Sequence, residues 1–314
     1  MPITILKSNL STRRKETYKK VFEALGDRLK TDVALARYTT FGIGGKADLF
    51  YPAAKPDELI DAIITAQKLK VRFFVLGGGS NILVSDSGFR GLVILNQCRN
   101  IIADQNTVTC QSGAILSDVI KQACNYSLSG LEFAAGIPGT VGGAIWGNAG
   151  AFGKSVGEVL SQAVILTEKG EIKEVEKDYL RFAYRESRLK TTREVLLSAT
   201  FGLEKGDKKE IEEKIKENLR EREEKLPLHE KSAGCFFKNV MQGNKKISAG
   251  LLLDQIGAKG MQIGDAKVST KHANMLINAK DAKAQEVKKL AQKLKKMVKE
   301  KFGINLQEEV VYIK

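Results

Sequence analysis

Features that define several large classes of proteins are missing from this sequence. Its 314 residues contain no uninterrupted apolar run of the roughly eighteen residues that a membrane-spanning helix needs. The N-terminal stretch MPITILKSNLSTRRKETYKK has no apolar core followed by a small-residue cleavage site, so it lacks the pattern of a signal peptide. We therefore expect a cytoplasmic protein without a membrane span.

Histidine, cysteine and proline are all scarce. The chain has two histidines, His229 and His272, and none of its four cysteines forms a CxxC pair, so no metal site is predicted. With only five prolines and 43% apolar residues, the composition is that of an ordered, multidomain globular protein. In a reducing compartment we expect free thiols at Cys98, Cys110, Cys124 and Cys235.

Acidic residues are too few to balance the basic ones, and the formal net charge is +14. Such an excess is common in nucleic-acid-binding proteins, because Lys and Arg neutralise phosphates. Between residues 204 and 225, however, basic and acidic residues alternate, as on a solvated helix with i,i+4 ion pairs. Only residues 283–301 are one-sidedly basic, and their apolar residues recur at helical spacing, at Val287, Leu290, Leu294 and Val298.

Aromatic residues, on which single-stranded nucleic acids stack, are sparse in that lysine-rich segment, where Phe302 stands nearly alone. We therefore interpret the segment as an amphipathic helix with a lysine-rich outer face, and we predict no nucleic-acid partner. A nucleic-acid-binding protein is the rival function from another class. The positive potential would also attract anionic nucleotides.

Periodic patterns predict a mixed α+β fold. Residues 55–69 combine a proline, an acidic first turn and the apolar spacing of a helix, and a buried strand over residues 72–76 follows it. Two long charged helices are expected between residues 207 and 302, and the final EEVVYIK alternates like a strand. Further strands are predicted at 82–84 and 91–95 and near Val108, Ala163 and Glu194, and a further helix near 115–125.

Two segments are unusually rich in glycine. LGGGSN follows the strand at 72–76, and by itself it favours an ordinary turn over an anion site. Residues 135–153 read AGIPGTVGGAIWGNAGAFG, with far more glycine than a connecting loop needs. Successive backbone N–H groups in such loops can converge on a phosphate. The second segment therefore favours an extended anion or cofactor site.

The identity of that cofactor can be narrowed by elimination. The GKS sequence at residues 153–155 lacks the glycine that a nucleoside-triphosphate loop requires, because Asn148 stands in its place. No GxGxxG opens a helix after the first strand, which argues against a Rossmann dinucleotide site. A pyrophosphate bound by two separated glycine-rich loops remains.

Seven motifs in one order carry a family resemblance. They are YTTFGIGGKADLF, FVLGGGSNILVSDSGFRGLVI, GLEFAAGIPGTVGGAIWGNAGAFG, FAYRESRLK, SAGCFFKN, GMQIGDAKVSTKHANMLIN and FGINLQEEV. From about Tyr38 to the C-terminus the chain resembles the UDP-N-acetylenolpyruvoylglucosamine reductase (MurB) family. Residues 239–251 are short, as in the subfamily that lacks the inserted loop with a substrate-covering tyrosine.

This resemblance implies a fold, a reaction and two cofactors. The fold is a two-domain FAD-binding unit of the vanillyl-alcohol-oxidase (PCMH) type with a third α/β domain that binds the substrate. The reaction is the NADPH-dependent reduction of UDP-N-acetyl-enolpyruvoylglucosamine to UDP-N-acetylmuramate in peptidoglycan biosynthesis. The implied segments are a lead at 1–30, FAD-binding subdomains at 31–96 and 97–206, a substrate-binding domain at 207–302 and a C-terminal strand at 303–314.

The alternative enzyme is a flavin-dependent sugar or alcohol oxidase of the same superfamily. Those oxidases often tether FAD through a histidine in the first glycine loop, and LGGGSN has none, so we expect non-covalent FAD. The positions that match the family's flavin-binding loops are Gly77, Gly79, Ser80, Asn81, Gly136, Ile137, Pro138, Gly139, Gly142 and Gly143.

The resemblance also implies catalytic residues. Arg185 and Glu309 match the pair that polarises the enolpyruvyl carboxylate, and Cys235 stands where the family commonly has a proton-donating serine. A thiol, with a reference pKa near ~8.5, is a stronger acid than an alcohol and can take that role. Without the resemblance, Arg185 would be interpreted as an ion-pair partner, Glu309 as a cap of a strand edge and Cys235 as a packed thiol. The positions that match the substrate side are Lys225, Asn239 and Gln262.

Overall fold

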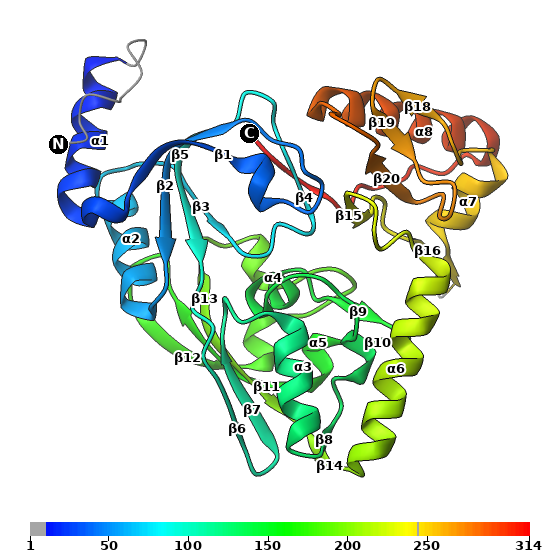
Figure 1. The fold of residues 1–314 in the computed structure, drawn as a ribbon, viewed down its shortest axis with the longest axis horizontal. Coiled ribbons are helices and arrows are strands. Elements are labelled where there is room, and N and C mark those ends of the chain that lie inside the picture. Colours follow the sequence, from blue (N-terminus) through cyan, green and yellow to red (C-terminus); the bar gives the residue numbers. More distant parts are fainter. Residues whose placement is uncertain (1–10, 244) are drawn as a thin grey trace. The chain divides into compact units, whose positions relative to one another are not determined.

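The computed structural model describes residues 11–243 and 245–314, which divide into two compact units. Unit 1 comprises the chain up to Val33, Asp48–Gly78 and Gly91–Arg220. Unit 2 comprises Ala34–Ala47, Gly79–Arg90 and Glu221–Lys314. The chain therefore passes through each unit more than once. Figure 1 identifies the elements of both units by label.

The first sheet of unit 1 has the strand order β1-β2-β5-β3, with β3 and β5 parallel. Helix α2 begins at Pro56, and the Glu58 carboxylate accepts hydrogen bonds from the N–H groups of Ala54 at 2.8 Å and Lys55 at 3.2 Å. Leu59 and Ile63 of α2 are fully buried in the core of this sheet. The elements are α1 (Thr12–Leu25), β1 (Lys30–Ala34), β2 (Lys46–Ala53), α2 (Pro56–Lys68), β3 (Phe73–Leu76) and β5 (Phe89–Asn96).

The second sheet of unit 1 is antiparallel, in the order β12-β11-β13-β7-β6. Helix α3 packs against β6 and β7, and its apolar face joins the large core of this sheet (Figure 1). The strands are β6 (Ile101–Asp104), β7 (Thr107–Gln111), β11 (Leu160–Leu166), β12 (Ile172–Glu176) and β13 (Val195–Gly202). The helices are α3 (Leu116–Asn125), α4 (Val141–Trp146) and α5 (Val156–Val159).

Short elements complete unit 1. Strands β9 (Gly150–Ala151) and β10 (Lys154–Ser155) form one small ribbon, and β8 (Leu128–Ser129) and β14 (Glu204–Lys205) form another. Helix α6 (Lys208–Lys225) runs from unit 1 into unit 2, and its described residues bury only Ile211 and Asn218, as its alternating charges predict. The 3₁₀ turns are η2 (Gly26–Arg28), η3 (Leu35–Tyr38), η4 (Glu132–Ala134), η5 (Lys177–Leu180) and η6 (Arg188–Lys190).

Unit 2 is built on an antiparallel sheet in the order β15-β20-β19-β18. Helix α8 packs beside β18 and β19 (Figure 1). The strands are β15 (Ser232–Cys235), β16 (Val240–Gln242), β17 (Lys245–Ile247), β18 (Gln262–Ile263), β19 (Ala266–Val268), β20 (Met275–Asn278), β4 (Ile82–Val84) and β21 (Val311–Ile313), and the helices are α7 (Ala249–Gln255) and α8 (Ala284–Phe302).

Helix α8 confirms the amphipathic interpretation of the lysine-rich segment. Its stripe Val287, Leu290, Leu294 and Val298 is fully buried in the core of unit 2. The first turn is capped from elsewhere in the chain, because the Asp86 carboxylate accepts from Ala284 N–H at 2.8 Å and Gln285 N–H at 3.1 Å.

The predicted elements are confirmed, but the strand predicted to be buried at 72–76 is β3, of which only Leu76 is buried. The helix at 55–69 is α2, the helix near 115–125 is α3, and the final alternating segment forms β21, parallel to β4. The α+β class is confirmed as well. The segment boundaries at 31–96, 97–206, 207–302 and 303–314 stay predictions, and residues 1–10 of the predicted lead 1–30 lie outside the described part of the chain.

No helix in the described ranges 11–243 and 245–314 is both long enough and apolar enough to cross a membrane. Within the same ranges, no group of three or more His, Cys, Asp and Glu side chains is placed to hold a metal ion. The four cysteines are separate thiols.

Candidate active site

The two glycine-rich segments meet in unit 1. A Cβ atom on Gly78 would lie 2.7 Å from the Cα of Gly139, and one on Gly77 would collide with the hydroxyl of Thr140. Because side chains cannot fit there, the end of β3 and the loop before α4 touch backbone to backbone. The contact leaves a bare peptide surface with N–H groups and no side chain, which suits a bound pyrophosphate.

The second loop is fixed to the sheet beneath it. Gly142 N–H donates to the carbonyl oxygen of Ser112 at 2.7 Å, and Val141 N–H donates to that of Ala114 at 2.9 Å. Thr140 caps α4, and its hydroxyl accepts from Gly143 N–H at 3.4 Å. The loop is therefore held in place by the end of β7 and the turn that follows it.

Gly79, Ser80 and Asn81 begin the stretch of the first loop that belongs to unit 2. Gly79 has a φ of 63°, and any Cβ atom there would overlap the carbonyl oxygen of Tyr38, so only glycine fits. The side-chain amide of Asn81 donates to the carbonyl oxygen of Glu309 at 3.4 Å, and Val311 N–H donates to that of Asn81 at 3.0 Å. The predicted flavin loop thus contacts the segment that carries Glu309.

Arg185 occupies the tip of a tight turn in unit 1. Ala183 and Glu186 exchange two backbone hydrogen bonds, of 3.1 and 3.0 Å, and Arg185 between them has a φ of 58°. This left-handed conformation strains a residue other than glycine by about 1–3 kcal/mol. The Arg185 Nη2 atom donates to the carbonyl oxygen of Gly150 at 2.9 Å. The hydrogen bond to Gly150 orients the guanidinium, and the turn holds the backbone that carries it.

Lys190 stabilises the same turn and was missed from the sequence. Its Nζ atom donates to the carbonyl oxygen of Arg185, lies 3.8 Å from the Glu186 carboxylate and stands 4.7 Å from the centre of the Trp146 ring. The side chain is only 13% exposed. The available signal was the lysine in FAYRESRLK, which lies five residues after Arg185.

A polar network lies just beyond this turn. Tyr179 OH donates to the Glu194 carboxylate at 2.6 Å, and Arg188 Nε donates to it at 3.0 Å. Burial would raise the pKa of Glu194, but the hydrogen bonds from Tyr179, Arg188 and Thr192 outweigh it and hold that pKa below its ordinary value. Glu194 therefore stays ionised, and it connects Tyr179, before the turn, to Arg188, after it.

Cys235 ends β15 in unit 2, where it pairs with Met275 of β20. Phe236 N–H donates to the carbonyl oxygen of Asn274 at 2.7 Å, and Glu309 N–H donates to that of Phe236 at 2.8 Å. The backbone of Phe236, the residue after Cys235, is therefore hydrogen-bonded to the backbone of Glu309, which is distant in sequence.

The other three cysteines differ from Cys235 in exposure. Cys98, Cys110 and Cys124 are buried, whereas Cys235 is half-buried. Burial raises the pKa of Cys110 to about 12. Burial, together with the Glu58 carboxylate, raises the pKa of Cys98 to about 11. These buried thiols are therefore poor nucleophiles and poor acids at neutral pH.

Each of the three residues predicted to bind the substrate forms an ion pair or a hydrogen bond with another residue of unit 2. Lys225, 66% exposed, pairs with the Glu221 carboxylate at 2.5 Å. The Asn239 side-chain oxygen accepts from Ala249 N–H at 3.0 Å at the start of α7, and the Gln262 amide donates to the carbonyl oxygen of Gly264 at 2.6 Å. Their roles toward a substrate stay predictions.

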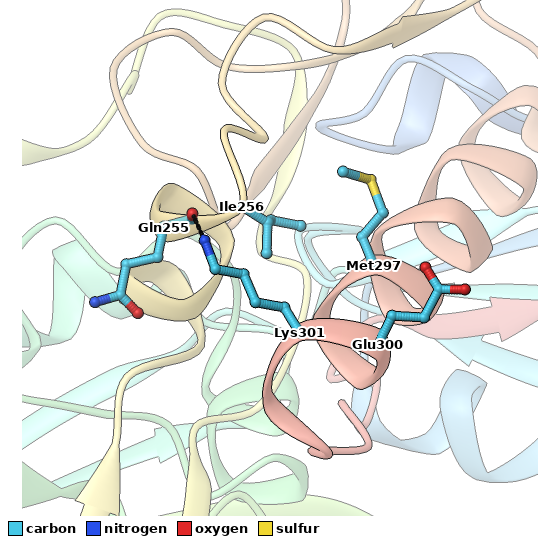
Figure 2. A pocket seen from close by; sticks show the side chains of 5 residues that line it. All are labelled: Gln255, Ile256, Met297, Glu300 and Lys301. Atoms are coloured by element: carbon cyan, nitrogen blue, oxygen red, sulfur yellow. Dashed lines mark hydrogen bonds between the residues drawn. The ribbon is translucent and has the colours of Figure 1, made fainter.

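A surface hollow of about 390 Å³ lies between α7 and α8 (Figure 2). In it, Lys301 Nζ donates to the carbonyl oxygen of Gln255 at 2.7 Å. The hollow is lined by Gln255, Ile256, Met297, Glu300 and Lys301. It shares no residue with the predicted site, so we assign no role in the chemistry to it.

Two family models match the chain. The model described as "UDP-N-acetylenolpyruvoylglucosamine reductase, C-terminal domain" matches residues 226–313, and the model described as "FAD binding domain" matches residues 47–176. UDP-N-acetylenolpyruvoylglucosamine reductase of Clostridium botulinum (strain Eklund 17B / Type B) is 37% identical over 94% of this chain and 97% of its own length. The enzyme of that name from Caldicellulosiruptor bescii is 41% identical over 90% of both chains.

The chain is also similar to solved structures. The chain is similar to UDP-N-acetylenolpyruvylglucosamine reductase (MurB) from Thermus caldophilus, with a TM-score of 0.78 and 31% identity over 91% of this chain and 99% of that one. Phl p 4, a grass pollen allergen with glucose dehydrogenase activity, matches 61% of this chain and 44% of its own with a TM-score of 0.50. At 15% identity, this second likeness shows the fold alone.

Proposed function

The chain belongs to the UDP-N-acetylenolpyruvoylglucosamine reductase family, and we propose how its own residues carry out the reduction of UDP-N-acetylenolpyruvoylglucosamine to UDP-N-acetylmuramate with NADPH. The family is one of FAD-dependent oxidoreductases of peptidoglycan synthesis. The observation that carries the proposal is the backbone hydrogen bond from Glu309 N–H to the carbonyl oxygen of Phe236, which places Glu309 beside the residue that follows Cys235 in unit 2.

The glycine-rich loops fit FAD. The contact of Gly78 with Gly139 leaves no room for side chains between the loops, and backbone N–H groups of these loops would bind the pyrophosphate. The residues that would hold FAD are Gly77, Gly79, Ser80, Asn81, Gly136, Ile137, Pro138, Gly139, Gly142 and Gly143. FAD, when bound, would supply hydride transfer from NADPH to the β-carbon of the enolpyruvyl group. LGGGSN contains no histidine, so the binding would be non-covalent.

The remaining chemistry falls to three side chains. Hydride addition to the β-carbon places negative charge on the substrate carboxylate, and the Arg185 guanidinium and the Glu309 carboxyl group would each stabilise that charge. The thiol of Cys235 would then donate its proton to the α-carbon. Because backbone hydrogen bonds hold the turn at Arg185 and the segment at Glu309, we expect little backbone rearrangement during the reaction.

Further assignments complete the proposal. Lys225, Asn239 and Gln262 would contact the nucleotide sugar. The FAD-binding subdomains would span 31–96 and 97–206, the substrate-binding domain 207–302, and the strand with the catalytic carboxyl group 303–314. We place the enzyme in the cytoplasm, since nucleotide sugars and NADPH are cytoplasmic metabolites, and its partners would be these small molecules and not nucleic acid.

The test separates reductase from oxidase. Purified, FAD-loaded protein is reduced with NADPH under anaerobic conditions, and the substrate is then added. We expect the flavin absorption to return only when the enolpyruvyl nucleotide sugar is present. Bleaching of the oxidised flavin by a simple sugar in the absence of NADPH, together with failure of the enolpyruvyl nucleotide sugar to reoxidise the reduced flavin, would favour the oxidase. Denaturation should release all flavin into the supernatant, whereas flavin that stays with the chain would contradict non-covalent binding.

A further inference from the structure

The segment after Cys235 is held by backbone hydrogen bonds to both of its neighbours. The N–H of Phe236 donates to the carbonyl oxygen of Asn274, and the carbonyl oxygen of Phe236 accepts from the N–H of Glu309. Lys238 N–H donates to the carbonyl oxygen of Gln307 at 2.8 Å, which continues the same contact. The position of Cys235 relative to Glu309 therefore depends on residues 236–238.

Asn274 adds its side chain to this arrangement. Its Oδ1 atom accepts from Phe237 N–H at 2.9 Å, and its Nδ2 atom donates to the carbonyl oxygen of Phe237 at 2.8 Å. The residue is 2% exposed, so water cannot replace either bond. The buried side-chain amide of Asn274 thus satisfies both backbone polar groups of Phe237, and the backbone carbonyl oxygen of Asn274 accepts from Phe236 N–H.

We propose that Asn274 is a positioning residue that fixes Cys235 and Glu309 relative to one another for the reduction of the substrate. This inference rests on the function proposed above, because it needs Cys235 as the acid and Glu309 as the carboxyl group. The Asn274 side chain bonds the backbone of Phe237, and the Asn274 carbonyl oxygen bonds Phe236 N–H, so Asn274 acts on Cys235 and Glu309 through the backbone of these two residues. Misplacement of a catalytic group by about 1 Å can slow a reaction roughly 10²-fold.

The chain offers a matched control on the same sheet. Asn278, the last residue of β20, is 7% exposed and also satisfies two backbone groups. Its Nδ2 atom donates to the carbonyl oxygen of Phe41 at 3.2 Å, and its Oδ1 atom accepts from Ala282 N–H at 2.9 Å. Asn278→Ala therefore removes a similar pair of bonds without touching residues 236–238.

The first experiment separates the two half-reactions by stopped flow in the FAD-loaded enzyme. We expect Asn274→Ala to be reduced by NADPH within about twofold of the wild-type rate, since this step needs neither Cys235 nor Glu309, and to be reoxidised by the substrate about 10–10²-fold more slowly. Asn278→Ala should lower the melting temperature by a similar amount and leave both steps within a few-fold of wild type. Equal slowing of reoxidation in the two variants would overturn the proposal.

The second experiment uses Asn274→Asp, which keeps the shape of the side chain. The protonated carboxyl group can donate to the carbonyl oxygen of Phe237 and accept from its N–H, as the amide does. The ionised form loses the donor and faces that oxygen with a negative charge. The rate of reoxidation relative to wild type should therefore be near one at acidic pH and fall as the pH rises through the pKa of the new carboxyl group.

The comparison with wild type removes other titrations from this profile. Both proteins contain the same other ionisable groups near residue 274, so the ratio of the two rates reports the new carboxyl group. These groups are Cys235, His272, Lys238, Glu308 and Glu309. A ratio that does not change with pH, or reoxidation of Asn274→Ala at the wild-type rate, would overturn the role of Asn274. Failure of the substrate to reoxidise the wild-type protein would instead contradict the proposed function, because that measurement involves no variant.

Discussion

At the scale of single residues, Cys235 differs from the other three cysteines in its surroundings. It is half-buried at the end of β15, and the others are buried in the cores of unit 1. We therefore expect a thiol alkylator to modify Cys235 first and to inactivate the enzyme, and we expect the bound nucleotide sugar to protect it. Peptide mass mapping after brief alkylation measures this selectivity. Modification of Cys110 or Cys124 before Cys235 would contradict the assignment.

Substitution of Cys235 tests its chemistry directly. Cys235→Ser keeps a hydroxyl group at the position of the proton donor and should retain substantial turnover. Cys235→Ala should bind FAD and oxidise NADPH normally, yet form product about 10²-fold more slowly, as expected for a lost general acid. Rapid-mixing measurements of product release distinguish the two variants. Product formation by Cys235→Ala at the wild-type rate would return Cys235 to the role of a packed thiol.

At the scale of elements, α8 depends on a cap from a distant part of the chain. The Asp86 carboxylate accepts from the first two N–H groups of this helix, and it also lies near the positive end of the helix dipole. We expect Asp86→Ala to lower the free energy of unfolding by about 1–2 kcal/mol. Asp61→Ala, on the exposed side of α2, is the matched control and should change it by less than about 0.5 kcal/mol. Urea titration of both variants gives the comparison, and equal losses would exclude the capping role.

Elements with a local signal could be predicted from the sequence, and contacts between distant segments could not. The lysine-rich helix follows from the spacing of Val287, Leu290, Leu294 and Val298, because helical periodicity is a property of neighbouring residues. The cap from Asp86, the left-handed turn at Arg185 and the bonds of Asn274 to Phe237 depend on partners far away in sequence or on strain. The periodicity of apolar residues indicates neither distant partners nor backbone strain.

At the scale of the whole molecule, the chain enters each unit several times. The segments Ala34–Ala47 and Gly79–Arg90 belong to unit 2 although most of their neighbours in sequence belong to unit 1. Pairing of β21 with β4 brings the C-terminal strand beside the segment that follows the first glycine loop. Such long-range strand pairing leaves no trace in the spacing of residues, so the sequence predicted contiguous segments. The motifs of the predicted site are nevertheless recognisable in the sequence, since each one is short and local.

The response of the fold to acid can be predicted from Glu58. Hydrogen bonds from Arg28, together with those from the backbone of Ala54 and Lys55, outweigh burial and lower the pKa of Glu58 from 4.5 to about 2. Because the folded-state pKa lies below the unfolded one, the stabilisation is complete above the unfolded pKa and is lost as the pH falls from about 4.5 to about 2.

The Glu58→Gln variant measures this contribution. At neutral pH it should be less stable than wild type by about 1 kcal/mol, a value reduced for solvent screening at this partly exposed pair. The difference should shrink as the pH falls below about 4.5 and vanish near 2. Denaturant titrations at several pH values test this, and a difference that grew on acidification would contradict the sign of the shift.

We propose that the carboxyl group of Glu309 and the thiol of Cys235 act only after NADPH has reacted. Stopped-flow measurement of the two half-reactions in Glu309→Gln tests this order. No charge develops on the substrate carboxylate during reduction by NADPH, so bleaching of the flavin should proceed at the wild-type rate. Reoxidation by UDP-N-acetylenolpyruvoylglucosamine should slow about 10²-fold. Equal slowing of both half-reactions, or normal reoxidation, would contradict the account.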